Sequence, residues 1–399
     1  MQAEVAERRT EKSVLIFSIE FPPHLGGAAT YARNLAVGLS DTGHNVTVLT
    51  ISRREEVDNQ ARIDRTLLES NGIAVKRIGF VPKFYLVVMA SALRRLLRER
   101  SFSALIIADS GAQKSSAFFL RLPDLPTWTV FHGSEADNYF GKSTLPLRLA
   151  GAPARMRKLF SSLSGCIAVS HWIRSQIVGL LPELDDRCTV VHHGVEFDER
   201  LLALSRDDAK TSLGIHTSKH VVFSASRLIE QKGQDVLLRA FAIAGKKEPD
   251  LLLVIAGDGP ARPGLEALAT SEGVADRVRF MGRLDSGRMG ACYRACDVFA
   301  QPSRYPFDSF GLVYLEANAC GRAVIAGNTA GIPESVEDGV SGFLVDPLDV
   351  DRISELLLRF ARDSEFRSRL EAGAVERVRR EFSLEAMARK TADLVFHGA

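Results

Sequence analysis

Residues 220–256 read HVVFSASRLIEQKGQDVLLRAFAIAGKKEPDLLLVIA, and this stretch decides the fold. Its two ends, 220–226 and 250–256, are near-continuous apolar runs, which are typical of strands buried on both faces of a parallel sheet. Between them, 233–245 carries apolar residues at three- and four-residue spacing, which predicts an amphipathic helix. A strand, a helix and a second strand form the repeating unit of parallel sheets covered by helices.

The same alternation extends over the whole chain in two series. The strand candidates of the first half are 14–20, 45–51, 73–80, 104–109, 126–131, 165–170 and 189–192. Those of the second half are 220–226, 250–256, 278–281, 297–301, 323–327 and 343–345. Two such series predict two doubly wound α/β domains. The length of 399 residues favours the same number, because a single core stops growing at roughly 250–300 residues.

A charged stretch, 196–210, follows the last strand of the first series. We therefore expect the division there, with domains at 1–202 and 203–382. The chain ends in a helical pattern from Ser383 to Phe396. Open α/β sheets bind ligands at the carboxyl ends of their strands, so two facing domains would place a ligand in the cleft between them.

The composition argues against several classes of protein. A formal charge of +2 does not suggest a nucleic-acid partner. No apolar run of about 18 residues is present to span a bilayer, and the first thirteen residues lack the apolar core of a signal peptide. The five cysteines form no CxxC pair, so we interpret the chain as a reduced, cytoplasmic protein. Cys292 and Cys296 lie four apart on the helix predicted at 286–296, and we assign them to the core rather than to a metal.

Two loops of the first half follow predicted strands. Gly26 and Gly27 lie between the first strand and a helix expected from about Thr30, and paired glycines before a helix let the backbone approach an anion. A plain tight turn explains the two glycines equally well. His132 closes the strand 126–131 and is expected to point toward the cleft.

The loop after strand 220–226 carries Arg227 and Lys232, five residues apart. Such a pair suits a diphosphate, because arginine forks onto phosphate oxygens and lysine supplies a compact point charge. Two solvated surface cations are the alternative interpretation. The position at the carboxyl end of a strand favours the diphosphate.

The stretch 301–321, QPSRYPFDSFGLVYLEANACG, places Asp308 before a helix expected to begin near Phe310-Gly311. Glu316 would lie about two turns into this helix, where an interior carboxylate needs a partner, and sugar or ribose hydroxyls would supply one. The backbone amides expected at the start of the helix, and so available to a phosphate, are those of Gly311, Leu312 and Val313.

Taken in order, these residues resemble glycosyltransferase family 4. The matching elements are the Gly-Gly loop, HGSE (132–135), SRL-x3-KG-x-D (226–235), AGDGP (256–260), the PS…FG-x4-E block (302–316), NTAGIPE (328–334) and GVSGFLVDP (339–347). Several short stretches are most similar to the phosphatidylinositol mannoside-type mannosyltransferases of that family.

The resemblance implies a GT-B fold, in which two Rossmann-like domains face each other and a C-terminal helix, 383–399, packs back on the first domain. It implies retaining transfer of a hexose from a UDP- or GDP-sugar to a lipid, glycan or small-molecule acceptor, with no metal and no other cofactor. The first domain would bind the acceptor and the second the donor.

The resemblance also assigns roles to individual residues. Arg227 and Lys232 would stabilise the leaving diphosphate, the Gly26-Gly27 loop would add backbone donors, and Glu316 would bind the ribose. Asp308 stands where the family has a glutamate that contacts the sugar. At this position the chain departs from the family pattern. The remaining donor-site residues implied are His132 beside the anomeric carbon, Gly257 in the AGDGP turn, and Arg283 and Leu284 at the base.

Other interpretations stay open. A nucleotide-sugar epimerase or another enzyme on a similar fold is the main alternative, and a two-domain sugar-binding protein of periplasmic type is a second. A dehydrogenase is disfavoured because the GxGxxG pattern is absent. The segments 91–100 and 147–160 are basic and amphipathic, which fits either a solvated helix face or peripheral contact with the inner face of a membrane.

Overall fold

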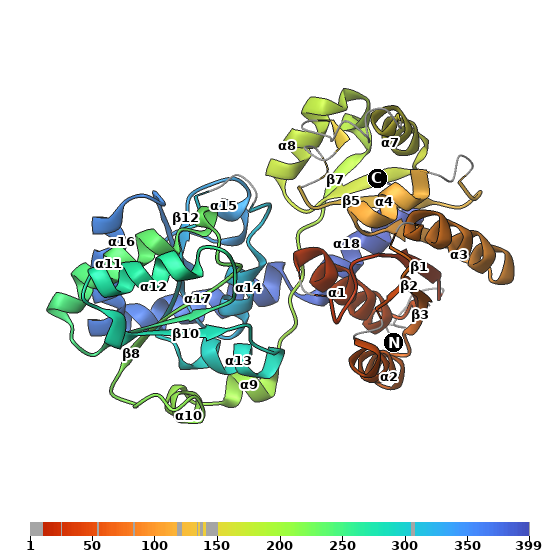
Figure 1. Cartoon of the computed structure of the whole chain (residues 1–399). Helices are drawn as coiled ribbons and strands as arrows, with labels where there is room; N and C mark the ends of the chain where they lie inside the picture. Colours follow the sequence, from red (N-terminus) through yellow and green to blue (C-terminus); the bar gives the residue numbers. More distant parts are fainter. Residues whose placement is uncertain are drawn as a thin grey trace, which may run out of the picture. The chain divides into compact units, whose positions relative to one another are not determined.

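The computed structural model describes residues 11–24, 26–53, 56–82, 84–117, 122–133, 135, 139–140, 151–304 and 308–398. Ser134 of the HGSE turn, residues 147–150 of the second basic segment and residues 305–307 lie outside the described residues. Two compact units make up the chain (Figure 1). The first comprises the residues up to Gly194 together with those from Leu384 onward, and the second runs from Val195 to Ser383.

The boundary between the units is set by backbone contacts near Gly194. The Gly194 N–H lies 3.1 Å from the Met387 sulfur within the first unit. The next amide, of Val195, donates to the Phe382 carbonyl within the second unit at 2.8 Å. The first unit therefore ends at Gly194 and not at 202, and the charged stretch 196–210 forms two short helices of the second unit.

The first unit is built on a seven-stranded parallel sheet in the order β3-β2-β1-β4-β5-β6-β7. Its strands are β1 (Ser13–Phe17), β2 (Asn45–Ser52), β3 (Ala74–Gly79), β4 (Ala104–Ile107), β5 (Thr127–Phe131), β6 (Gly165–Ala168) and β7 (Cys188–Val190). Its helices are α1 (Gly27–Asp41), α2 (Val57–Asn71), α3 (Tyr85–Glu99), α4 (Ser110–Ala117), α7 (Ala152–Ser162), α8 (His171–Leu180), the 3-10 helix η2 (Pro182–Arg187) and α18 (Leu384–His397).

The second unit is built on a six-stranded parallel sheet in the order β10-β9-β8-β11-β12-β13. Its strands are β8 (His220–Ala225), β9 (Leu251–Ala256), β10 (Val278–Gly282), β11 (Val298–Gln301), β12 (Val324–Gly327) and β13 (Gly342–Val345). Its helices are α9 (Glu199–Ala203), α10 (Arg206–Ser212), η3 (Glu230–Lys232), α11 (Gln234–Lys247), α12 (Arg262–Ser271), η4 (Ala275–Arg277), α13 (Ser286–Ala295), α14 (Leu312–Ala319), α15 (Ile332–Ser335), α16 (Val350–Arg362) and α17 (Ser364–Glu381).

Helices cover both faces of the second sheet (Figure 1). On one face, Val222 of β8 packs in a core with α11, α12 and α16. On the other, Val221 and Phe223 pack with α13 and α14, so successive residues of one strand enter opposite cores. Cys292 and Cys296 are buried in the second of these cores, as expected.

These sheets confirm the predicted fold class, two doubly wound α/β units. Every strand predicted from the sequence is present, with ends moved by up to a few residues. The first strand, for example, ends at Phe17 and not at residue 20, because Ser18 and the next two amides turn away to bind the carboxylate of Asp109. The last helix, α18, packs against α1, where the space opposite Gly38 is filled by the Leu384 carbonyl, 2.6 Å from where a Cβ would lie.

The strand orders place the functional loops. In each sheet the order reverses beside the first strand, between β1 and β4 and between β8 and β11. Ligands of open α/β sheets bind where such a reversal separates the loops that leave the carboxyl ends of the strands. The candidate residues of both units follow these strand ends.

No helix in the described ranges is both long and apolar enough to cross a membrane.

Candidate active site

In the second unit, glycines allow the loops at the carboxyl ends of the strands to pack directly on one another. A Cβ on Gly257 would lie 1.8 Å from the Ser226 carbonyl oxygen, and one on Gly233 would lie 2.1 Å from that of Pro302. Both glycines have positive φ, 119° and 72°. Only glycine fits such positions, so Gly257 shapes the site by letting the loop after β9 touch the loop after β8.

Lys232 and Asp308 form an ion pair in this loop cluster. The Lys232 Nζ, at the end of η3, donates to Asp308 Oδ1, and both side chains are largely buried. Arg304 adds two ion contacts to the same loop cluster, because its guanidinium binds Asp235 at 3.1 Å and lies 3.6 Å from Glu230. The structure therefore brings together the residue predicted for the diphosphate and the residue predicted for the sugar.

Arg227 is exposed, in contrast to Lys232. Its carbonyl is held by the Ile229 N–H at 3.0 Å and the Ser226 hydroxyl at 3.1 Å. Within the described ranges, no carboxylate pairs with its guanidinium. The arginine is fixed at its backbone and has its charge available.

Glu316 lies in the first turns of α14 and is partly buried. Its Oε2 accepts a hydrogen bond from the buried Tyr293 hydroxyl at 2.9 Å. Burial raises the pKa of the Glu316 carboxyl, and the Tyr293 hydrogen bond partly opposes that rise. Since α14 begins at Leu312, Glu316 sits little more than one turn inside it and not two, and its first partner is a tyrosine that the sequence analysis missed.

The start of α14 leaves backbone donors without a capping side chain. Gly311, at the N-cap, has φ 82°, and no side chain caps the helix. The first amide that bonds back is that of Tyr314, to the Gly311 carbonyl at 3.0 Å. The amides of Leu312 and Val313 come before it, and such first-turn amides lack intrahelical acceptors and favour an anion.

Arg283 and Leu284 follow β10 at the same edge of the sheet. The Gly282 carbonyl accepts from the Gly257 amide at 2.7 Å, so this loop adjoins the Gly257 turn. Arg283 is exposed, whereas Leu284 packs against the core beside α13.

In the first unit, the Gly26-Gly27 loop leads directly into a helix. Helix α1 begins at Gly27, earlier than the predicted Thr30, and the Thr30 amide bonds to the Gly26 carbonyl at 3.0 Å. Both glycines are exposed, and nothing lies within 4 Å of where a Cβ on Gly27 would be. The backbone at this helix start is open to a ligand.

His132 is held from three sides. Its amide and that of Gly133 donate to the buried Glu135 carboxylate, the latter at 2.7 Å. The ring Nε2 lies 2.8 Å from the Ala108 carbonyl, and the ring meets Tyr31 edge-on at 5.0 Å. Because a carbonyl oxygen only accepts, this contact requires a proton on Nε2.

Asp109 and Glu20 were missed by the sequence analysis. Asp109 is buried and accepts from the Ser18 hydroxyl at 2.7 Å and the Ile19 amide at 2.6 Å, so it fixes the loop after β1. Burial raises the pKa of the Glu20 carboxyl, and the nearby carboxylates of Asp109 and Glu135 add to the rise. Asp109 closes the apolar run ALIIAD, and an acid at that position was the available signal.

Comparison with known proteins defines the class. The model of Glycosyltransferase Family 4 matches residues 25–199, and that of Glycosyl transferases group 1 matches residues 205–377. Among solved structures, the Anabaena protein HepE in complex with UDP and glucose superposes with a TM-score of 0.75 over 96% of this chain and 99% of its own, at 22% identity. The two sheets therefore form the GT-B fold of glycosyltransferases.

Curated relatives place the chain more closely. The GDP-mannose-dependent alpha-(1-6)-phosphatidylinositol monomannoside mannosyltransferase of Mycolicibacterium smegmatis is 30% identical over 354 residues, covering 86% of this chain and 87% of its own. The GDP-mannose-dependent monoacylated alpha-(1-6)-phosphatidylinositol monomannoside mannosyltransferase of Corynebacterium glutamicum is 27% identical over 394 residues, covering 96% and 98%. The chain belongs to glycosyltransferase family 4 and is a glycosyltransferase.

Proposed function

We propose that this enzyme transfers mannose from GDP-mannose, with retention of the anomeric configuration and without a catalytic metal. The two relatives above are named as GDP-mannose-dependent mannosyltransferases, which supports the donor. The observation that carries the mechanism is the cationic corner of the second unit, where the exposed Arg227 and the Lys232 ammonium follow one strand.

In this proposal Arg227 and Lys232 hold the diphosphate and stabilise its charge as it leaves. Lysine has three N–H donors, so Lys232 can keep its bond to Asp308 and still bind a phosphate oxygen. The amides at the start of α14 add donors with a favourable helix dipole. Glu316 binds the ribose through Oε1, for which no protein partner exists in the described part of the chain, while Tyr293 holds Oε2.

The contacts of the two carboxylates support a route to retention that needs no protein nucleophile. Asp308 is paired with Lys232 and Glu316 is bonded to Tyr293, so neither carboxylate is prepared as a nucleophile. The acceptor hydroxyl then attacks from the side that the diphosphate leaves, and a phosphate oxygen accepts its proton. Asp308 is left to contact the sugar hydroxyls beside the lysine.

The acceptor we propose is a mannosylated phosphatidylinositol, as in the names of the two relatives. The test is an assay of purified enzyme with GDP-mannose or UDP-glucose and a phosphatidylinositol monomannoside, with the product anomer determined by NMR. We expect an α-mannoside from GDP-mannose. An inverted product, or turnover of UDP-glucose alone, would contradict the proposal. Epimerised nucleotide formed without any acceptor would instead establish the epimerase alternative.

We further propose that the first unit touches membranes through the start of α3. Phe84 and Val87 are 63% and 53% exposed, and the neighbouring Phe80 and Val81 are 39% and 42% exposed. Arginines follow along the same helix, at Arg94, Arg95 and Arg98. Exposed apolar residues beside cations suit the interface of an anionic membrane.

Vesicle co-sedimentation tests this contact. Phe84→Ser should weaken binding to phosphatidylcholine vesicles that contain phosphatidylglycerol, whereas Leu348→Ser is the control, since Leu348 is 62% exposed and lies in the second unit. Equal binding by both variants would show that α3 makes no lipid contact.

A further inference from the structure

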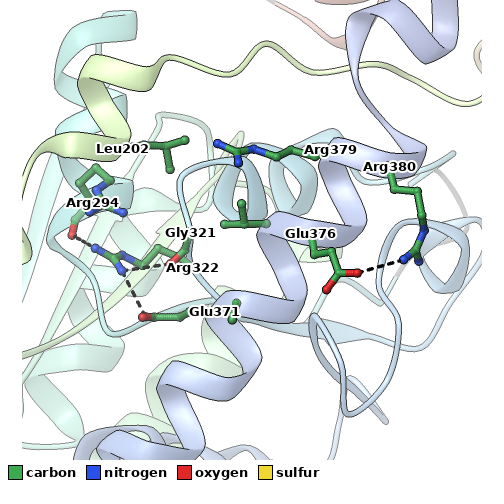
Figure 2. A pocket seen from close by; sticks show the side chains of 10 residues that line it. Leu202, Arg294, Gly321, Arg322, Glu371, Glu376, Arg379 and Arg380 are labelled. Carbon is green, nitrogen blue, oxygen red and sulfur yellow. Dashed lines mark hydrogen bonds and ion pairs between the residues drawn. The ribbon is translucent and has the colours of Figure 1, made fainter.

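A pocket that is open to solvent and rich in arginine lies in the second unit. It has a volume of about 840 Å³ and is lined by Arg294, Arg322, Arg379 and Arg380, with Glu371 and Glu376 (Figure 2). We call it the arginine cavity. Its volume falls within the roughly 300–1,000 Å³ typical of small-molecule sites.

The arginine cavity is separate from the donor site. Arg294 lies at the end of α13, directly before β11, and Arg322 directly precedes β12. These are the amino ends of the strands, whereas Arg227 and Lys232 follow the carboxyl end of β8. In a parallel sheet the two sets of ends form opposite edges, so a ligand in the arginine cavity would not occupy the donor site.

Two of the arginines are rigid because they cap helices. The Arg294 Nη1 donates to the Cys320 carbonyl at 2.8 Å, near the end of α14. Arg322 donates to the carbonyls of Tyr293 at 3.1 Å and Arg294 at 2.6 Å, at the end of α13. Burial, together with the positive charge of the nearby Arg206, lowers the pKa of Arg322 to about 10.

Carboxylates balance the charges of the two fixed arginines only in part. Glu371 is shared by Arg206 and Arg322, which approach the same oxygen at 2.5 and 3.2 Å. Arg294 bonds only to backbone carbonyls within the described ranges. Arg206 also lies 3.6 Å from Asp297, so Arg206, Arg294 and Arg322 share two carboxylates and leave an excess of positive charge. A partly desolvated cation attracts an anion more strongly than the same charge does in water.

The other two arginines, Arg379 and Arg380, have exposed side chains that are free to change conformation. Arg379 is 53% exposed, and its partner Glu199 is 74% exposed at 3.0 Å. Figure 2 shows the Arg379 side chain extending across the cavity toward Leu202. Arg380 pairs with Glu381 at 2.7 Å and lies 3.5 Å from Glu376. Exposed ion pairs of this kind contribute little to the free energy of folding, so a ligand anion can replace the carboxylate at small cost in stability.

Part of the cavity lining is apolar. Leu202, Ala372 and Val375 line it between the charged groups. A Cβ on Gly321 would lie 3.2 Å from the Arg294 Nη1 and 3.6 Å from a Val375 methyl, so the glycine keeps this part open. The cavity therefore offers positive charge for an anion and an apolar surface for the body that carries it.

We propose that the arginine cavity binds a phosphate monoester on a small organic body, either a soluble phosphorylated metabolite or the headgroup of phosphatidic acid. Arg322 and Arg294 supply fixed positive charge, and Arg379 and Arg380 donate hydrogen bonds to the phosphate. The proposal is independent of the sugar donor, because no residue of the donor site takes part.

Calorimetric titration of the full chain with glycerol 3-phosphate, and co-sedimentation with phosphatidylcholine vesicles with and without phosphatidic acid, test the two sources. The double variant Arg379→Gln/Arg380→Gln should raise the dissociation constant about tenfold or more, as expected for lost charge-assisted hydrogen bonds. The matched control is Arg239→Gln, because Arg239 is also 53% exposed with one carboxylate partner, Glu272, at 2.8 Å. Lys232→Ala should leave this binding unchanged.

Binding of glycerol 3-phosphate that the double variant weakens identifies a soluble ligand. Binding only to phosphatidic acid vesicles, weakened in the same way, identifies a lipid headgroup. The proposal is overturned if neither probe binds at millimolar concentration, if the double variant binds as the wild type does, or if Arg239→Gln weakens binding equally.

Discussion

Replacing Glu316 with glutamine should stabilise the protein and weaken nucleotide binding at the same time. Burial raises the pKa of this carboxyl above its ordinary value of 4.5, so the folded chain holds the proton more tightly than the unfolded chain does. As the pH rises from about 4.5 through the folded pKa, the unfolded chain loses its proton first and the free energy of unfolding falls. Glu316→Gln removes this loss, so its advantage is absent at low pH and full above the folded pKa.

The magnitude follows from the contacts. One carboxylate oxygen is bonded to Tyr293 at 2.9 Å, and the other has no protein partner in the described residues. An unsatisfied buried polar group costs about 1–3 kcal/mol, and because Glu316 is only partly buried we expect the lower value, about 1 kcal/mol. For a unit of this size that corresponds to a rise in Tm of about 2–4 °C. The lost ribose contact should raise the Kd of GDP about tenfold.

The assay is thermal unfolding at pH 4.5 and pH 8.0, together with titration of GDP. Tyr293→Phe is the opposing variant, because it removes the donor and raises the Glu316 pKa further. Its loss of stability should grow as the pH rises, whereas the gain of Glu316→Gln grows. If Glu316→Gln were equally destabilising at both pH values, or bound GDP as the wild type does, the assignment of Glu316 as a buried ribose ligand would be wrong.

Three further outcomes are expected. Lys232→Ala and Arg227→Ala should each lower kcat/KM by roughly 10²-fold or more, which corresponds to about 2.7 kcal/mol of transition-state stabilisation. If both variants kept activity within about threefold of wild type, the two residues would be solvated surface cations without a role in catalysis. Turnover should survive EDTA, and complete loss that added metal restores would show that a metal stabilises the diphosphate. Asp308→Asn should impair turnover of the sugar nucleotide much more than binding of the bare diphosphate, and equal effects on both would exclude a contact with the sugar.

Local patterns in the sequence were enough to predict both sheets. Apolar runs such as 220–226 and 250–256 indicate strands that are buried on both faces of a sheet, and the helical spacing at 233–245 indicates a crossover helix. The position of Arg227 and Lys232 at a strand's carboxyl end followed directly, because each strand's direction is fixed by the parallel sheet. Family membership followed from ordered motifs spread over nearly the whole chain.

Side-chain partners could not be predicted, because they depend on which strands are neighbours. Lys232 meets Asp308 since β8 lies beside β11, and these two residues are 76 positions apart. Glu316 meets Tyr293 because α14 and α13 share one face of the sheet, and the contact of Gly257 with Ser226 needs β9 beside β8.

The sequence by itself determined the strands, the order of the motifs and the family. Only the tertiary structure decided that Asp308 is bound to Lys232, that Tyr293 holds Glu316, and that four arginines from α13, α17 and the turn after α14 line one cavity. Periodicity is a local property that burial imposes on each element. A pairing between side chains distant in sequence exists only once the sheet has set the order of its strands.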